Sequence, residues 1–303
     1  MNKDEIWDRI KGDKDEVYGM SMLDMFLKTT EKLISKHYEE LPQDKRKLLD
    51  PDIRLKNATT VAEAERAIKD GAKELNWALR SAVKRGHFEM MKLLVDRGAK
   101  GVDEALHFSA KNGHLEAVKF LVSRGADVNR RVDVDYALGE LDGAIPALRR
   151  AASNGHLEVV KFLVDNGAKD LNGSLWSASR GGHLEIVEFL VGKGAEDVDE
   201  ALDFAVEYGH LEVVDFLANK GTKNLDRKLS IAARNGHLEV VKFLVDKGAK
   251  DLDRAFRVAA EQGHLEVIDY LLDGVDDPKK AVLYAYQYGP TKVVEFLKGR
   301  GAK

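Results

Sequence analysis

The sequence predicts an all-α solenoid built from stacked helix pairs. Three observations carry this prediction: a Gly-His dipeptide that recurs at a constant step, two apolar stripes of helical period within each step, and glycines where the stripes end. One unit of this kind cannot bury its own apolar face. Stacked units bury it against each other, and the result is a linear array of repeats.

The Gly-His dipeptide occurs seven times, at intervals of 27, 42, 27, 27, 27 and 27 residues. The long interval places an insertion at 127–141. An eighth unit follows 26 residues after the seventh and carries Gly289-Pro290 instead. Eight repeats therefore cover residues 73–302. The glycines of the seven dipeptides are Gly86, Gly113, Gly155, Gly182, Gly209, Gly236 and Gly263.

Each unit is predicted to contain two short helices, as the seventh unit illustrates. Asp253 is expected at the N-cap of the first helix, because its carboxylate can accept hydrogen bonds from free amide groups there. Gly263 is expected to end that helix in a left-handed conformation. The second helix has a wide apolar arc. Five other units carry Asp or Asn at the position of Asp253: Asn76, Asp103, Asn172, Asp199 and Asp226.

One position in the second helix is aromatic or leucine in every unit, and Phe243 represents it. We expect this side chain to be buried, so that Phe243→Ala would cost about 3–5 kcal/mol.

Composition excludes several classes of protein. The net charge is −4, so no global basic field recruits nucleic acid or an anionic membrane. There is no cysteine, which excludes disulfides, zinc–thiolate sites and a cysteine nucleophile. No stretch is long and apolar enough to span a membrane, and the first residues lack the apolar region of a signal peptide. A cytoplasmic location is expected, in the cell of origin or in a host cell.

The stretch from Leu229 to Val241 resembles the ankyrin repeat. Leu229, Ala232 and Ala233 match the first-helix core of that family, and Gly236-His237-Leu238-Glu239-Val240-Val241 matches its central turn and second helix. Ankyrin units usually have about 33 residues. The shorter step here implies that most β-hairpin fingers are trimmed and that one enlarged finger survives at 127–141.

The ends of the array are expected to be capped. Residues 1–57 are predicted to form an N-terminal helical cap, with a helix-period stripe between Leu23 and Leu41. Residues 58–302 form the solenoid, in which 58–72 is a half-repeat. Lys298 brings a polar side chain to the last unit, as a terminal repeat requires.

No candidate for catalysis or metal binding stands out. The histidines of the Gly-His dipeptides are about 10 Å apart by helix-packing geometry, too far to share one zinc ion. The resemblance implies instead that each histidine ties its turn together by hydrogen bonds. Acidic pairs lie at helix starts, where capping explains them. We therefore expect no enzyme, no cofactor and no metal.

In the ankyrin family the first helices line the concave side, which binds partner proteins. The resemblance implies a protein–protein interaction module here: an adaptor, scaffold or inhibitor that is monomeric alone. Arginines and aromatics on one face suit an interface hot spot, and the 127–141 loop is expected to add Arg131 and Tyr136. Nucleic-acid binding through the basic early repeats is the alternative. The expected partner-binding residues are Arg85, Phe108, Lys111, Arg131, Tyr136, Arg150, Trp176, Arg180, Phe204 and Tyr208.

Overall fold

A computed structural model describes residues 49–132 and 144–300. The chain divides into two compact units, residues 1–102 and residues 103–303, and each is described by itself. The helix expected between Leu23 and Leu41 lies outside the described residues, as does Tyr136.

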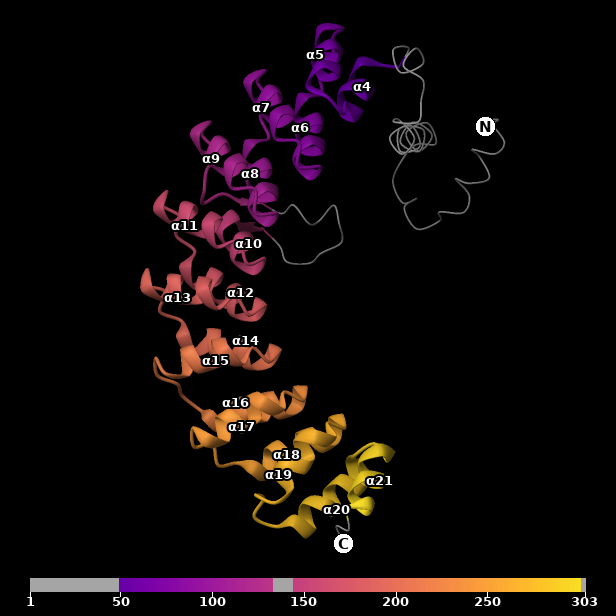
Figure 1. The fold of residues 1–303 in the computed structure, drawn as a ribbon, viewed down its shortest axis with the longest axis vertical. Helices are drawn as coiled ribbons and strands as arrows, with labels where there is room; N and C mark the ends of the chain where they lie inside the picture. Colours follow the sequence, from indigo (N-terminus) through magenta and orange to yellow (C-terminus); the bar gives the residue numbers. More distant parts are fainter. Residues whose placement is uncertain (1–48, 133–143, 301–303) are drawn as a thin grey trace, which may run out of the picture. The chain divides into compact units, whose positions relative to one another are not determined.

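Unit 1 contains two helix pairs within its described part (Figure 1). Asp50 caps the first helix by accepting a hydrogen bond of 2.8 Å from the Asp52 amide. That helix packs on its partner and on the first helix of the next pair. The last residues of the segment 1–57 therefore act as the first helix of a pair, while a boundary at residue 57 stays a prediction. The helices are α4 (Pro51–Asn57), α5 (Val61–Lys69), α6 (Leu75–Lys84) and α7 (Phe88–Asp96).

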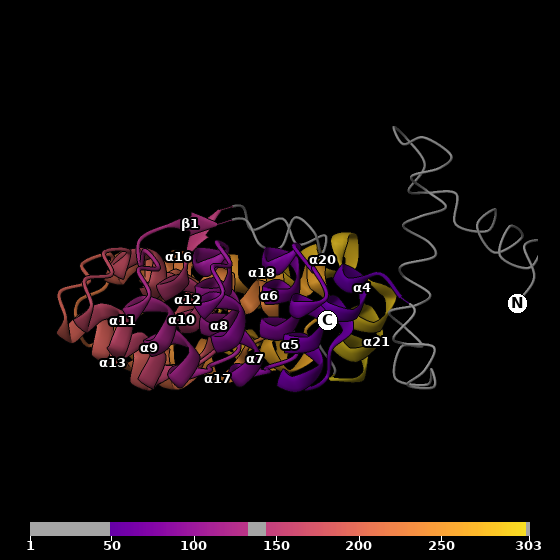
Figure 2. The ribbon, with the colours of Figure 1, turned by 90° about the horizontal axis from the view of Figure 1, so that it is seen from above.

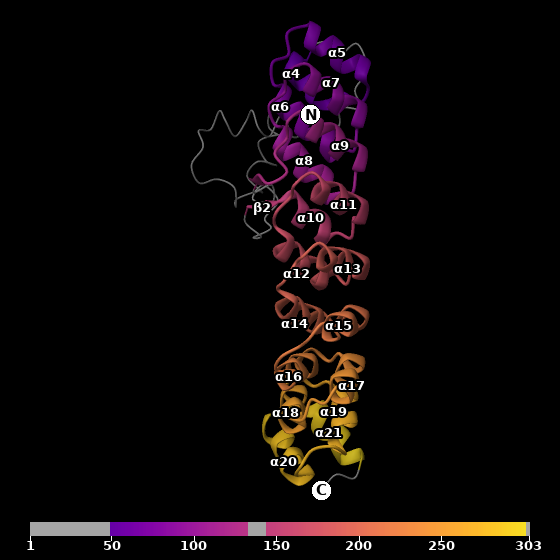
Figure 3. The same ribbon diagram turned by 90° about the vertical axis from the view of Figure 1, so that its left-hand side faces the viewer.

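Unit 2 contains seven helix pairs within its described part. The first helices of the pairs lie on one side of the unit and the second helices on the other (Figures 1 and 3). The first helices are α8 (Val102–Lys111), α10 (Ala147–Ser153), α12 (Leu171–Gly181), α14 (Val198–Tyr208), α16 (Leu225–Asn235), α18 (Leu252–Gln262) and α20 (Pro278–Tyr288). The second helices are α9 (Leu115–Ser123), α11 (Leu157–Asp165), α13 (Leu184–Gly192), α15 (Leu211–Ala218), α17 (Leu238–Asp246), α19 (Leu265–Leu272) and α21 (Thr291–Gly299).

The core follows the two apolar stripes of each unit. In the sixth unit the first helix buries Leu229 and Ala233, and the second buries Val241 and Leu244, all completely. Alanines on the first helices let consecutive pairs approach closely. The prediction of a helix-pair solenoid is confirmed.

The aromatic row of the second helices is not part of this core. Phe243 is only half-buried, and the ammonium of Lys247 lies 5.2 Å from the centre of its ring. Phe189 and Phe216 have the same arrangement with a lysine four residues later, at 5.3 and 5.1 Å. The expectation of full burial was wrong, because this position lies at the edge of the helix, where a cation can cover the ring.

In five of the seven Gly-His dipeptides the histidine contacts the preceding repeat. His237 Nε2 lies 2.8 Å from the carbonyl oxygen of Glu207, at the end of the preceding first helix. Its ring also lies against Gly209, which has φ 78° and where an added Cβ would be 2.5 Å from His237 Nδ1. Glycine is thus required there for conformation and for space. The same histidine–carbonyl contact joins His156 to Lys111, His183 to Ser153, His210 to Arg180 and His264 to Arg234.

The repeated Asp or Asn does not cap its own helix. Asp253 is the second residue of α18, and Asp251 occupies the N-cap and accepts from the Arg254 amide at 3.1 Å. The N-cap expectation was therefore wrong. In five repeats the Asp or Asn side chain instead accepts a hydrogen bond from a backbone amide in the turn before the next repeat, 24 residues later in the sequence. These bonds join Asn76 to Lys100, Asp103 to Asp127, Asn172 to Glu196, Asp199 to Lys223 and Asp226 to Lys250.

A short antiparallel ladder joins residues of the insertion to residues that follow it. Strand β1 (Arg131–Val132) pairs with β2 (Ile145–Pro146), and Figure 2 shows β1 outside the helical layers. This is the only sheet within the described ranges, so the other units have no finger strands there. Asn129 Oδ1 accepts a 2.9 Å hydrogen bond from the Lys169 amide, and the bond between consecutive units is thus kept across the insertion.

Candidate functional site

Four of the predicted residues form one group on the first-helix side of unit 2. Trp176 and Arg180 lie on α12, and Phe204 and Tyr208 lie on α14. The Trp176 and Phe204 rings are 6.5 Å apart and inclined by 37°. The guanidinium of Arg180 lies 5.0 Å from the centre of the Tyr208 ring, which is within the range of a cation–π contact. We call these four residues the surface cluster.

The helices fix the surface cluster from below. Leu175 and Ala178 of α12, like Ala205 of α14, are fully buried, so the residues beside them face outward. Tyr208 is 42% exposed and Trp176 is half-buried. The Trp176 indole nitrogen has no hydrogen-bond partner among the described residues. The surface cluster therefore combines apolar surface and a cation, and the buried residues of α12 and α14 hold it in place.

The other predicted residues are more scattered. Arg85, in unit 1, is exposed and donates to the Lys56 carbonyl at 3.1 Å. Lys111 is half-buried. Arg131 is exposed on β1 and donates from Nε to the Ala144 carbonyl at 3.0 Å. Tyr136 belongs to the residues that are not described.

Two predicted contact residues are buried. Phe108 is 5% exposed and Arg150 is 4% exposed, so the expectation that they lie on an open surface was wrong. The chain that returns from the insertion passes over this part of α8, because the Ile145 carbonyl lies 3.0 Å from His107 Nε2. These positions therefore carry structural side chains.

His107 is completely buried at the same place. Its Nδ1 lies 2.8 Å from the Asp103 carbonyl oxygen. Burial lowers the pKa of His107 below its ordinary value, and the nearby charge of Arg150 lowers it further, while the hydrogen bonds oppose both. His107 thus has a structural role at the junction of α8 and β2.

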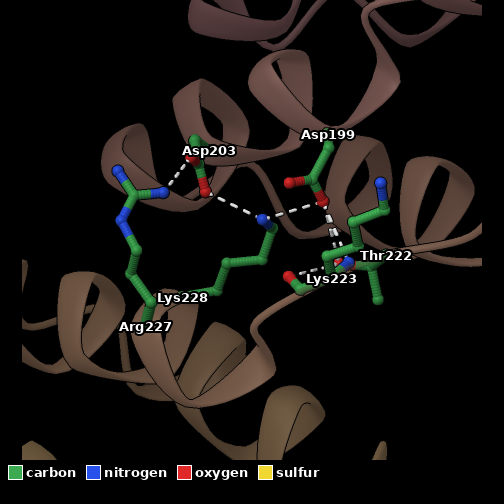
Figure 4. Close-up of polar contacts among 6 residues, drawn as sticks. All are labelled: Asp199, Asp203, Thr222, Lys223, Arg227 and Lys228. Carbon is green, nitrogen blue, oxygen red and sulfur yellow. Dashed lines mark hydrogen bonds and ion pairs between the residues drawn. The ribbon is translucent and has the colours of Figure 1, made fainter.

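Sequence reasoning missed the most unusual polar cluster, which lies between α14 and α16 (Figure 4). Lys228 is fully buried, and its Nζ lies 3.0 Å from carboxylate oxygens of both Asp199 and Asp203. Arg227 forms a further ion pair with Asp203. Every other repeat has Ala or Ser at the position of Lys228. This difference is visible in the sequence and could have identified the cluster. The equivalent residues are Ala78, Ala105, Ala147, Ser174, Ala201, Ala255 and Ala281.

The chain between α15 and α16 differs as well. Asn224 is the only non-glycine residue with a positive φ, 52°, among those described. Thr222 stands where most of the other turns have alanine, and Asp199 accepts a 3.0 Å hydrogen bond from the Lys223 amide. Burial acts to raise the pKa of Asp199, but that hydrogen bond and Lys228 outweigh it and hold the pKa below its ordinary value. Asp199 is therefore ionised at neutral pH.

Neither a metal centre nor a membrane span is found within residues 49–132 and 144–300. No three His, Cys, Asp or Glu side chains there are grouped so as to hold an ion. None of the helices in the same ranges combines the length and apolar character needed to cross a bilayer.

Comparison with known proteins agrees with this architecture. The family described as "Ankyrin repeats (3 copies)" matches residues 57–132, 148–228 and 229–303, and "Ankyrin repeats (many copies)" matches 106–164. The solved human ASB11 ankyrin repeat domain is similar at 26% identity with a TM-score of 0.51, over 63% of this chain and 96% of that one. No curated protein matches. The chain belongs to the ankyrin-repeat family.

Proposed function

We propose that this protein is an adaptor, scaffold or inhibitor that binds a folded partner protein on the first-helix side of unit 2. The surface cluster is the centre of the site. The ankyrin-repeat family supports a protein–protein interaction module in general. The geometry of the cluster supports this particular place, because tryptophan, tyrosine and arginine dominate the binding energy of protein interfaces.

The single observation that carries the proposal is the pairing of Trp176 with Phe204 and of Arg180 with Tyr208 across two helices. These contacts hold the side chains in place before a partner arrives, so binding orders fewer rotamers. Lys111 and Arg131 lie in the same unit and are proposed as surrounding contacts. Arg85 and Tyr136 keep their predicted roles as further contacts.

Binding of a purified partner to Tyr208→Ala and Trp176→Ala variants tests the site. The partner is first captured by the wild-type chain and then titrated against each variant. Loss of about 2 kcal/mol, close to 30-fold in affinity, is expected for a hot-spot residue. Lys161→Ala, on the second-helix side, is the matched control, because Lys161 forms its ion pair within α11, with Glu158 at 2.8 Å. Unchanged affinity in both folded cluster variants refutes the proposed site.

The insertion needs a separate test. Deleting 127–141 also removes Asn129 and its hydrogen bond to Lys169, and would confuse folding with binding. Arg131→Ala combined with Tyr136→Ala keeps that bond. A loss of affinity with unchanged stability supports a contact role for the loop, and unchanged affinity excludes one.

Nucleic-acid binding remains the competing hypothesis, but no observation favours it. Arg150 is buried, and Arg149 Nε donates to Ser177 Oγ at 3.0 Å, so the basic early repeats present less free charge than their composition implies. Binding of the chain to DNA or RNA that weakens as the salt concentration rises would support this hypothesis. The proposal further includes no catalytic activity, a cytoplasmic location and a monomeric free chain.

A further inference from the structure

One position of consecutive first helices alternates in charge. Arg180, Glu207, Arg234 and Glu261 are 27 residues apart, lie on α12, α14, α16 and α18, and are all exposed. We call them the charge row. Arg180 also contacts Tyr208 of the surface cluster, and Glu261 accepts a hydrogen bond from the Tyr284 hydroxyl. Glu207 and Arg234 make no side-chain ion pair among the described residues.

The backbone under the charge row is held in place. The carbonyl oxygens of Arg180, Glu207 and Arg234 face the histidine of the next unit at 2.9, 2.8 and 2.8 Å. The three charged side chains therefore extend from fixed points, one repeat apart. Neighbouring packed helices lie about 10 Å from each other. Among the described residues none of these three side chains forms an ion pair, so their charges are available to a partner.

The spacing selects the conformation of the partner. In an α-helix, seven residues rise about 10.5 Å and return to nearly the same face. In an extended strand, about 10 Å corresponds to three residues, which point to opposite faces. A strand would also need backbone partners, whereas the carbonyls at the row already accept hydrogen bonds from histidines. A helix satisfies its own backbone groups.

We propose that the charge row binds an amphipathic helix of a partner protein that carries acidic, basic and acidic side chains at seven-residue intervals. The acidic residues face Arg180 and Arg234, and the basic residue faces Glu207. An apolar residue one turn after the first acid lies over Trp176 and Phe204. The inference rests on the proposed function, since it names the kind of partner that the first-helix side fits.

Two synthetic helical peptides test the inference against the full chain. One carries Glu, Arg and Glu at seven-residue intervals, and the other carries Arg, Glu and Arg, with equal net charge set by their ends. Binding is followed by amide chemical shifts, which also report weak affinity. The chain is expected to prefer the first peptide roughly tenfold, given three exposed ion pairs of modest strength, and the preference shrinks at high salt.

The decisive measurement is a crossed exchange of charge. The variant Arg180→Glu/Glu207→Arg/Arg234→Glu should prefer the second peptide. The control Glu239→Lys/Lys242→Glu exchanges an ion pair of 2.8 Å on the second-helix side and should keep the wild-type preference. A variant that retains the wild-type preference, or a chain that never discriminates between the peptides, overturns the inference. A version of the first peptide with a central proline cannot form a continuous helix. If it binds as tightly as the first peptide itself, the partner does not bind as a helix.

Failure of the charge row is distinguishable from failure of the proposed function. Suppose that Tyr208→Ala weakens binding of the captured partner while the chain binds both peptides equally. The surface cluster is then supported as the binding site, and the role of the charge row is refuted.

Discussion

Lys228 Nζ lies 3.0 Å from Asp199 Oδ1, although the lysine side chain is fully buried. The two helices that it joins, α14 and α16, are in less extensive contact than α12 and α14 (Figure 3). Buried ion pairs seldom stabilise more than apolar packing does, but a buried charge without its partner is costly. The sign of a mutational effect here therefore depends on which charge is removed.

The double variant Asp199→Asn/Asp203→Asn leaves the Lys228 ammonium buried without a counter-charge. We expect a loss of about 3–5 kcal/mol in the free energy of unfolding, measured by urea titration. Adding Lys228→Ala should restore most of it, because alanine is the residue that most other units have there. Asp226→Asn, at the position of Asp199 in the next unit, should cost less than about 1 kcal/mol. Equal losses in the double and triple variants would contradict this account.

Gly209→Ala should destabilise more than Gly194→Ala. Both glycines have positive φ, 78° and 95°, so each alanine carries backbone strain of about 1–2 kcal/mol. Only at Gly209 would the new Cβ meet a side chain, His237, whose hydrogen bond adds about 1 kcal/mol when lost. In a His237→Ala background the two substitutions should cost the same. A difference that persists there would mean that the histidine contact is not its cause.

Leu244→Ala should cost more than Phe243→Ala, although phenylalanine is larger. Leu244 is completely buried, so truncation leaves a cavity and costs about 2–5 kcal/mol. Phe243 is half-buried, and its loss removes partial burial and the contact with Lys247, together about 1–2 kcal/mol. Chemical denaturation of both variants decides the order, and the reverse order would place Phe243 in the core.

His107 should make stability depend on pH just below neutrality. Since burial lowers its pKa in the folded chain, the unfolded chain binds a proton that the folded chain does not. The contribution of His107 is complete above pH 6.5, its ordinary pKa, and is progressively lost as the pH falls from there towards the lowered value. Unfolding free energies of the wild type and His107→Gln should therefore diverge less at pH 5.5 than at pH 7.5. A constant difference between the two pH values would show that His107 does not titrate in this way.

The repeat step and the glycine positions let the sequence predict the helix pairs, because one unit repeated eight times removes most ambiguity from a local pattern. The role of the repeated Asp or Asn could not be read in the same way. Within one unit it stands beside a helix start, and only stacking brings the backbone of the following turn within reach of Asn172. Phe108 and Arg150 were misplaced for a related reason: both are buried where the repeat is interrupted by the insertion, and a periodic pattern contains no information about the packing there.

Lys228 shows a different limit. Its departure from alanine is visible in the sequence, but a lysine in a helical pattern is ordinarily a solvated residue. Its burial depends on two carboxylates four residues apart on the preceding first helix, Asp199 and Asp203. Neither carboxylate is unusual in the sequence, so only their distances to Lys228 in the folded chain identify the cluster.

The histidine–carbonyl contacts and the hydrogen bonds that the repeated Asp or Asn accepts share one property: donor and acceptor come from consecutive repeats. Any segment of 27 residues therefore contains the donor of one such contact and the acceptor of another, and their partners lie in the repeats on either side. Removing or duplicating such a segment rejoins matching halves of these two kinds of contact, so the array can change length by whole repeats wherever the change does not separate Lys228 from Asp199 and Asp203. Asn129 and Lys169 extend this rule, since they remain joined across 40 residues. Growth by duplication, and tolerance of added chain between units, are consequences of where these few hydrogen bonds begin and end.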